Sequence, residues 1–106
     1  MTVAYKISLK ATVVSGSAER MAESVASVAE HLDDIQRNTP AFLGFTLSSN
    51  RNERTALFNM YVNEDDPEKA TAAAHAWAVT AINATGDSTR QWATFAHPEE
   101  RERVPA

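Results

Sequence analysis

The sequence predicts an α+β domain with the order β-α-β-β-α-β, in which a four-stranded antiparallel sheet carries both helices on one face. Three observations predict this class. Two long segments have the periodicity of amphipathic helices, and each follows a segment in which apolar and polar residues alternate. Two alternating segments lie between the helices and are joined by a short polar turn, which is typical of a β-hairpin. The 106 residues suffice for a single domain with one core.

The first part of the chain predicts a strand, a turn and a helix. Apolar and polar residues alternate over residues 2–14, and Ser15-Gly16-Ser17 interrupts this pattern. Ser17 is the predicted N-cap of a helix that runs to about Arg37. Apolar residues recur there every three or four positions and form one stripe, which consists of Met21, Val25, Val28, Leu32 and Ile35.

The middle of the chain predicts the hairpin. Pro40 ends the first helix, because the residue before a proline is excluded from the α region. Residues 41–49 and 54–63 then alternate as two strands around the polar turn at residues 50–53.

The second hairpin strand has an apolar side and a polar side. Phe58, Met60 and Val62 alternate with Asn59 and Tyr61. We expect the apolar side to pack against the sheet of a second copy of the chain, since an uncovered apolar face needs a partner. The polar side should then face the helices and line a cavity there.

The last part of the chain predicts a second helix, a fourth strand and a tail. Asp66 and Pro67 are a typical N-cap and first helical residue, and Gly86 is the expected C-terminal glycine. One face of this helix is nearly all alanine around Trp77, so it either packs very close to the sheet or leaves room for a ligand. Residues 88–97 predict the fourth strand. The domain should therefore span residues 1–97, and the charged residues 98–106 form a tail that is mobile or lies on a partner.

Composition excludes several classes of function. The net charge of −4 and the absence of a basic stripe argue against nucleic-acid binding. The absence of cysteine excludes disulfides and thiolate chemistry and is consistent with a reducing compartment. The first residues show no apolar run of signal-peptide or membrane-span length. We therefore expect a soluble cytoplasmic protein that does not act at a membrane.

Two segments carry a resemblance to a known family. Residues 38–45 read Asn-Thr-Pro-Ala-Phe-Leu-Gly-Phe, and residues 58–66 read Phe-Asn-Met-Tyr-Val-Asn-Glu-Asp-Asp. With the order of elements, they resemble the dimeric α+β barrel superfamily and, within it, the antibiotic biosynthesis monooxygenase family. This resemblance covers residues 3 to about 97. It implies a ferredoxin-like fold that pairs into a dimeric barrel, with a pocket between the sheet and helices of each subunit.

The resemblance also implies a chemistry. Members of the family that form quinones oxidise polycyclic phenols with O₂ and no cofactor, and related members degrade haem in the same place. Asn59 matches the pocket asparagine of the monooxygenases by position. Asn63 stands where a tryptophan is usual, and Ser8 stands where the haem degraders have an asparagine. We therefore expect no haem and no other cofactor.

The candidate site residues follow from both lines of reasoning. Asn59 and Tyr61 are the predicted catalytic residues, because a buried amide or phenol needs a hydrogen-bonding partner such as a substrate oxygen. Substrate-binding roles are predicted for Trp77, His31, Asn63 and Ser8. The three histidines are scattered over separate elements, so no metal site is predicted.

Three functions remain open at this point. The first is a cofactor-independent monooxygenase that acts on a flat aromatic or polyketide-like molecule. The second is a cyclase or isomerase that uses the same pocket. The third is a homodimer that binds a small molecule without catalysis, and a pocket filled by Trp77 and Met21 would favour it.

Overall fold

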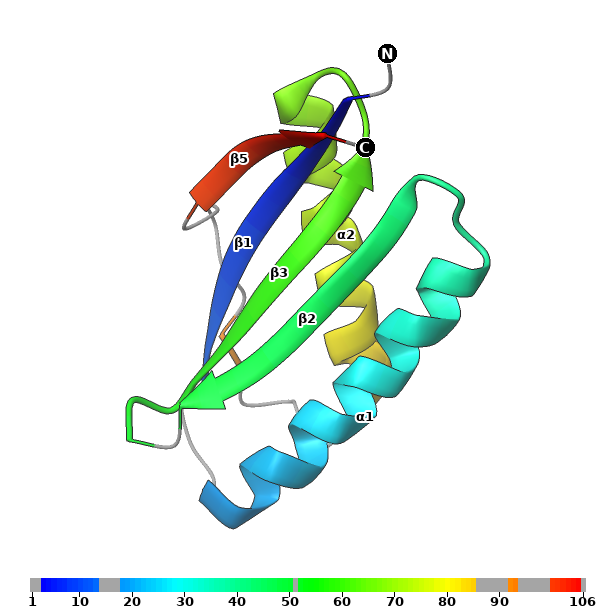
Figure 1. The fold of residues 1–106 in the computed structure, drawn as a ribbon. Coiled ribbons are helices and arrows are strands. Elements are labelled where there is room, and N and C mark those ends of the chain that lie inside the picture. Colours follow the sequence, from blue (N-terminus) through cyan, green and yellow to red (C-terminus); the bar gives the residue numbers. More distant parts are fainter. Residues whose placement is uncertain (1–2, 14–17, 51, 86–91, 94–99, 106) are drawn as a thin grey trace.

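The computed structural model describes residues 3–13, 18–50, 52–85, 92–93 and 100–105. The elements, in chain order, are β1 (Val3–Val13), α1 (Ala18–Arg37), β2 (Phe42–Asn50), β3 (Thr55–Asn63), α2 (Pro67–Thr85), β4 (Trp92–Ala93) and β5 (Glu100–Pro105) (Figure 1). The predicted α+β class and the order of the three long strands and two helices are confirmed.

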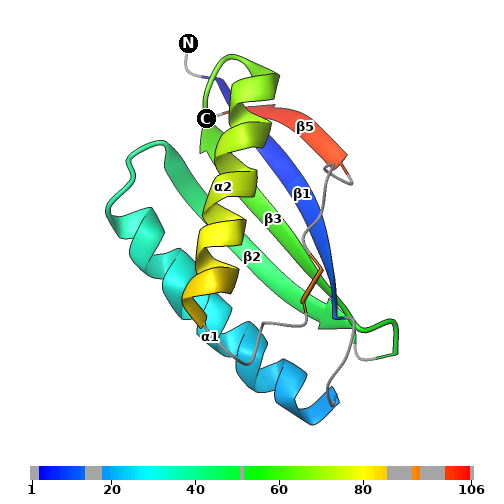
Figure 2. The same cartoon turned by 180° about the vertical axis from the view of Figure 1, so that it is seen from behind.

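The strands form one antiparallel sheet in the order β2-β3-β1-β4. Both helices cover the same side of this sheet (Figures 1 and 2). We call the opposite side, which the helices leave uncovered, the open face. None of the described helices is long and apolar enough to cross a membrane.

The C-terminal part of the chain differs from the expectation. Only Trp92 and Ala93 of the predicted fourth strand are described, and they pair with Val13 and Thr12 of β1. The rest of that strand lies outside the described residues. The segment expected to be a charged tail forms β5, which pairs with β1 from Val3 to Ser8. A strand edge offers unpaired backbone donors and acceptors, and β5 pairs with this edge of β1 from Val3 to Ser8.

Local chemistry explains where the helices begin and end. The carboxylate of Asp66 accepts a hydrogen bond from the backbone N–H of Glu68 at 2.9 Å, which caps α2, and Pro67 follows as its first residue. At the end of α1 the amide of Asn38 donates to the carbonyl of Asp34 at 2.9 Å. The chain then turns into β2 with a hydrogen bond from the backbone N–H of Phe42 to the carbonyl of Thr39.

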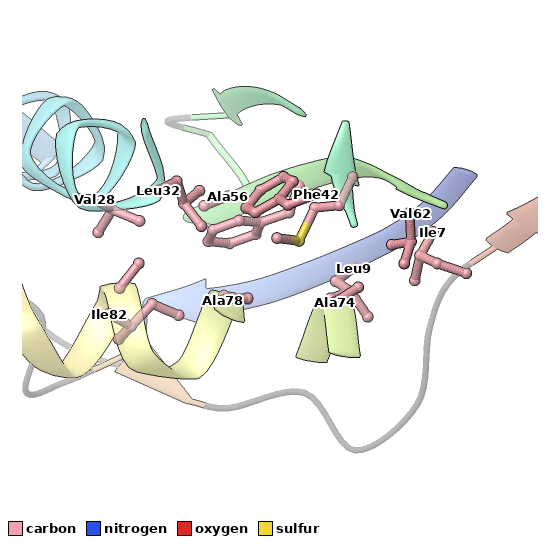
Figure 3. Close-up of a cluster of buried hydrophobic side chains, with 14 of the residues drawn as sticks. Ile7, Leu9, Val28, Leu32, Phe42, Ala56, Val62, Ala74, Ala78 and Ile82 are labelled. Carbon is pink, nitrogen blue, oxygen red and sulfur yellow. The ribbon is translucent and has the colours of Figure 1, made fainter. Parts of the chain in front are cut away.

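The core lies between the sheet and the two helices (Figure 3). Four alanines of α2 are fully buried, and their small side chains allow the helix to approach the sheet closely. The alanine face therefore packs against its neighbours. The other fully or almost fully buried residues of this cluster are Ile7, Leu9, Ala11, Val28, Leu32, Phe42, Ala56, Phe58, Met60, Val62 and Ile82.

The expected dimer interface belongs to this core, so its assignment is wrong. Phe58, Met60 and Val62 are at most 1% exposed and contact the helix side of the molecule. Strand alternation separates the two sides of β3 but does not tell which side the helices cover. Since each helix must bury its own apolar stripe, the helices take the apolar side of the sheet.

The turn between β2 and β3 contains a strained residue. Arg54 has a φ of 55°, the left-handed region, which costs a side chain with a Cβ roughly 1–2 kcal/mol. Replacing Arg54 by glycine should raise the free energy of unfolding by about 0.5–1 kcal/mol. Arg54→Ala keeps the Cβ and should change it little. Urea unfolding of both variants tests this, and an equal gain from both would show that removal of the charge is the cause.

Candidate functional site

The predicted site residues lie on two sides of the sheet. Asn59 and Tyr61 alternate with the buried residues of β3, so they lie on the open face, together with Ser8 of β1. Trp77 and His31 belong to α2 and α1 and are half-buried on the helix side. The expectation that the polar side of β3 faces the helices is therefore wrong, because that side of the sheet is filled by the core.

Trp77 packs against the protein's own side chains on the helix side. Its ring stacks on that of Phe42 with centroids 4.5 Å apart and an interplanar angle of 3°. A β-bulge between Phe42 and Gly44 makes this contact possible, because it turns both Phe42 and Phe45 toward the helices. One face of the indole is thus occupied by Phe42. A substrate-binding role for Trp77 or His31 stays a prediction.

The open face carries a hydrogen-bonded row that crosses three strands. The hydroxyl of Ser8 donates to Oδ1 of Asn59 at 2.6 Å, and Nδ2 of Asn59 donates to Oγ1 of Thr46 at 3.2 Å. The register explains the row, because Ser8 and Thr46 are the cross-strand partners of Asn59 on either side. We call Ser8, Asn59 and Thr46 the amide row.

The amide row fixes the orientation of the Asn59 side chain. An asparagine amide has two N–H donors and two acceptor positions on its oxygen. Among the described residues, Thr46 uses one donor and Ser8 uses one acceptor position. Asn59 is half-buried, so the second N–H can reach a bound molecule. The row therefore presents one fixed hydrogen-bond donor in the middle of the sheet.

Tyr61 and two lysines lie next to the amide row. Tyr61 pairs with Lys6 on one side and with Gly44 on the other. Apart from its chain neighbours, no atom of the described residues lies within 4 Å of the position that a Cβ of Gly44 would take, so space is open beside Tyr61. Lys10 follows on the other side of Ser8, opposite Leu57. The open face therefore combines hydrogen-bond donors with two lysines, and in the register Glu100 and Glu102 of β5 are opposite Ser8 and Lys6. Lys10 and the donors near it suit an oxygen-rich or anionic molecule.

A hollow of ≈ 380 Å³ lies beside the amide row at the hairpin end of the open face. It is lined by Lys10 of β1, Leu57 and Thr55 of β3, Ser48 and Asn50 of β2, and Glu53 of the turn. In the register, Lys10, Leu57 and Ser48 are cross-strand neighbours two residues along from the amide row. The row and the hollow thus form one continuous surface.

Two features of this surface were not predicted from the sequence: the pairing of Thr46 with Asn59 and the position of the hairpin turn. Thr46 was not among the predicted site residues, because its pairing with Asn59 depends on the register of the hairpin. The predicted turn at residues 50–53 is displaced by one residue, since Asn50 pairs with Thr55 and the turn lies between them. Asn63, also predicted to bind substrate, is exposed at the end of β3 opposite Ala4.

No cluster of potential metal ligands occurs within the described part of the chain.

Comparison with known proteins identifies the fold. A structure described as "Putative antibiotic biosynthesis monooxygenase from Bacteriodes thetaiotaomicron VPI-5482" aligns with a TM-score of 0.51 and 14% identity, over 96% of this chain and 87% of that one. The chain shares this fold. The structural genomics "protein YJCS" aligns with a TM-score of 0.50 and 9% identity, over 97% of this chain and 98% of that chain. No family model and no curated protein matches the sequence.

Proposed function

We propose that the protein is a small-molecule enzyme that oxidises a flat, polyketide-like phenol with O₂ and without a cofactor. The observation that carries this proposal is the amide row, which holds a hydrogen-bond donor of Asn59 in place on the open face. The shared fold with a structure named as a monooxygenase supports the reaction class.

The proposed reaction converts a ring methylene into a carbonyl. The deprotonated substrate transfers one electron to O₂, and the resulting pair combines to a peroxide at that carbon. Cleavage of the O–O bond with loss of water leaves the C=O group. One O₂ is consumed and one water is released for each carbonyl formed, so that the substrate itself is the reductant.

The chain's own groups would stabilise the substrate anion. The second amide N–H of Asn59 donates to the anionic oxygen, and the phenol of Tyr61 donates from the neighbouring position of the same strand. Donors that are already oriented need not reorganise when charge develops, which makes their contribution large. Ser8 and Thr46 act as positioning residues, since they touch the amide and not the substrate.

Oxygen uptake tests the reaction class. With a panel of anthrone-type phenols, we expect O₂ consumption that depends on the enzyme and equals the carbonyl formed. A cyclase or isomerase would convert its substrate without consuming O₂. Binding without any conversion would favour the non-catalytic alternative.

The non-catalytic alternative would use the same open face. On the helix side, the stacked rings of Phe42 and Trp77 pack between the sheet and α2, where the family resemblance implies a pocket. A small-molecule binding protein would therefore bind at the amide row, as the proposed enzyme does. The oxygen-uptake experiment separates it from the enzyme.

We also propose a homodimer in which the open faces of two chains face each other and enclose the amide row and the hollow between the two sheets. The support is the uncovered face of the sheet and the resemblance to dimeric barrels. Light scattering at micromolar concentration should then report about 23.2 kDa, twice the chain mass of 11.6 kDa.

Leu57→Glu places a charge on this face and should yield a monomer. Leu43→Glu, at an exposed leucine on the bulge of β2, should leave the dimer intact. A dimer that survives Leu57→Glu would place the interface elsewhere.

A further inference from the structure

The hollow beside the amide row is rich in hydrogen-bond donors. Oδ1 of Asn50 accepts from the backbone N–H groups of Asn52 at 3.0 Å and Glu53 at 3.2 Å. Its acceptor atom is thus engaged, and the amide nitrogen remains to donate. The hydroxyls of Ser48 and Thr55 add two further groups that can donate.

Lys10 supplies the positive charge of the hollow. It is half-buried and forms no ion pair within the described residues. Among the described strands, β5 pairs with β1 only as far as Ser8 and β4 pairs with it only at Thr12 and Val13, so no described strand pairs with Lys10 on this edge. Lys6, by contrast, has Glu102 of β5 as its cross-strand partner. Lys10 is therefore better placed than Lys6 to bind an anion.

We propose that the hollow binds a carboxylate of the substrate through Lys10, so that the substrate is a hydroxy-aromatic carboxylic acid. This inference rests on the proposed function. With the hydroxyl oxygen at Asn59 and the carboxylate at Lys10, the ring lies beside Leu57, which is on the same face of β3 as Asn59 and is the cross-strand partner of Lys10. Asn59 is about 7 Å from Leu57 along β3, and Lys10 is about 5 Å farther across on β1, so this diagonal matches the span of an aromatic ring system.

Among the described residues that line the hollow, Glu53 is the one with an acidic side chain. It lies in the exposed turn, where solvent screens its charge, whereas Lys10 is half-buried and screened less. The attraction of Lys10 should therefore exceed the repulsion of Glu53. Removing the Glu53 charge should tighten the binding of an anion.

NMR titration of the protein with three probes tests the inference. A hydroxynaphthoate carries both groups, whereas naphthol lacks the carboxylate and naphthoate lacks the hydroxyl. We expect the hydroxynaphthoate to bind at least tenfold more tightly than naphthol. Lys10→Met should abolish this difference, and Glu53→Gln should increase it.

Lys6→Met is the matched control, since Lys6 lies on the same strand and face outside the hollow. It should leave the difference unchanged. A tenfold preference that persists in Lys10→Met, or an equal loss in Lys6→Met, would overturn the inference. Naphthoate binding that depends on Lys10, without O₂ consumption for any phenol, would support the carboxylate site while rejecting the proposed oxygenase.

Discussion

Replacing Asn59 by leucine should lower turnover by roughly 10²–10³ while the domain stays folded. The amide is fixed by Ser8 and Thr46, so it supplies a donor whose orientation no other described group of the row can reproduce. Because this donor acts on charge that develops in the transition state, the loss should appear in kcat more than in KM. Oxygen uptake gives the rate, and thermal unfolding reports whether the fold persists.

Two further variants test the role of the amide. Ser8→Ala removes the group that orients Asn59 but leaves the amide, so we expect a smaller loss of roughly fivefold to tenfold, as for one hydrogen bond. Asn83→Leu makes the same chemical change as Asn59→Leu on an exposed part of α2 and should leave turnover unchanged. Full activity of Asn59→Leu on the true substrate would reject the assignment and favour the binding protein.

Truncating Phe58 to alanine should destabilise the domain by about 3–5 kcal/mol. Its side chain is fully buried between the sheet and the helices, so that the substitution leaves a cavity in the core. A loss of this size is a large part of the total stability of a small domain, about 5–15 kcal/mol. Urea unfolding followed by circular dichroism measures it.

Leu57→Ala is the matched control, because Leu57 neighbours Phe58 on the same strand but is half-buried on the open face. It should cost clearly less than Phe58→Ala. If Phe58→Ala converted a dimer into a stable monomer without loss of stability, the apolar side of β3 would be an interface and not the core.

The sequence by itself determined the class of the fold. The alternation in residues 2–14, 41–49 and 54–63 and the helical stripe from Met21 to Ile35 predicted the three long strands and α1. Caps and prolines placed the start of α2, because these signals act between residues close in the chain. The same alternation separated Asn59 from Phe58, since this separation depends only on the two-residue period of a strand.

Only the tertiary structure decided which side of the sheet each of these residues faces. The choice depends on where the helices pack, which is a long-range property that no local pattern records. The amide row likewise required the register of β2 and β1 against β3, and a turn that lies one residue later than predicted brought Thr46 opposite Asn59. The hollow around Lys10 depends on the register of β1, β2 and β3, and the charged composition of residues 100–105 gave no sign that they would pair with β1 as a strand. Local periodicity determines the faces of an element, whereas burial of the whole chain determines which face becomes core and which remains available for a ligand.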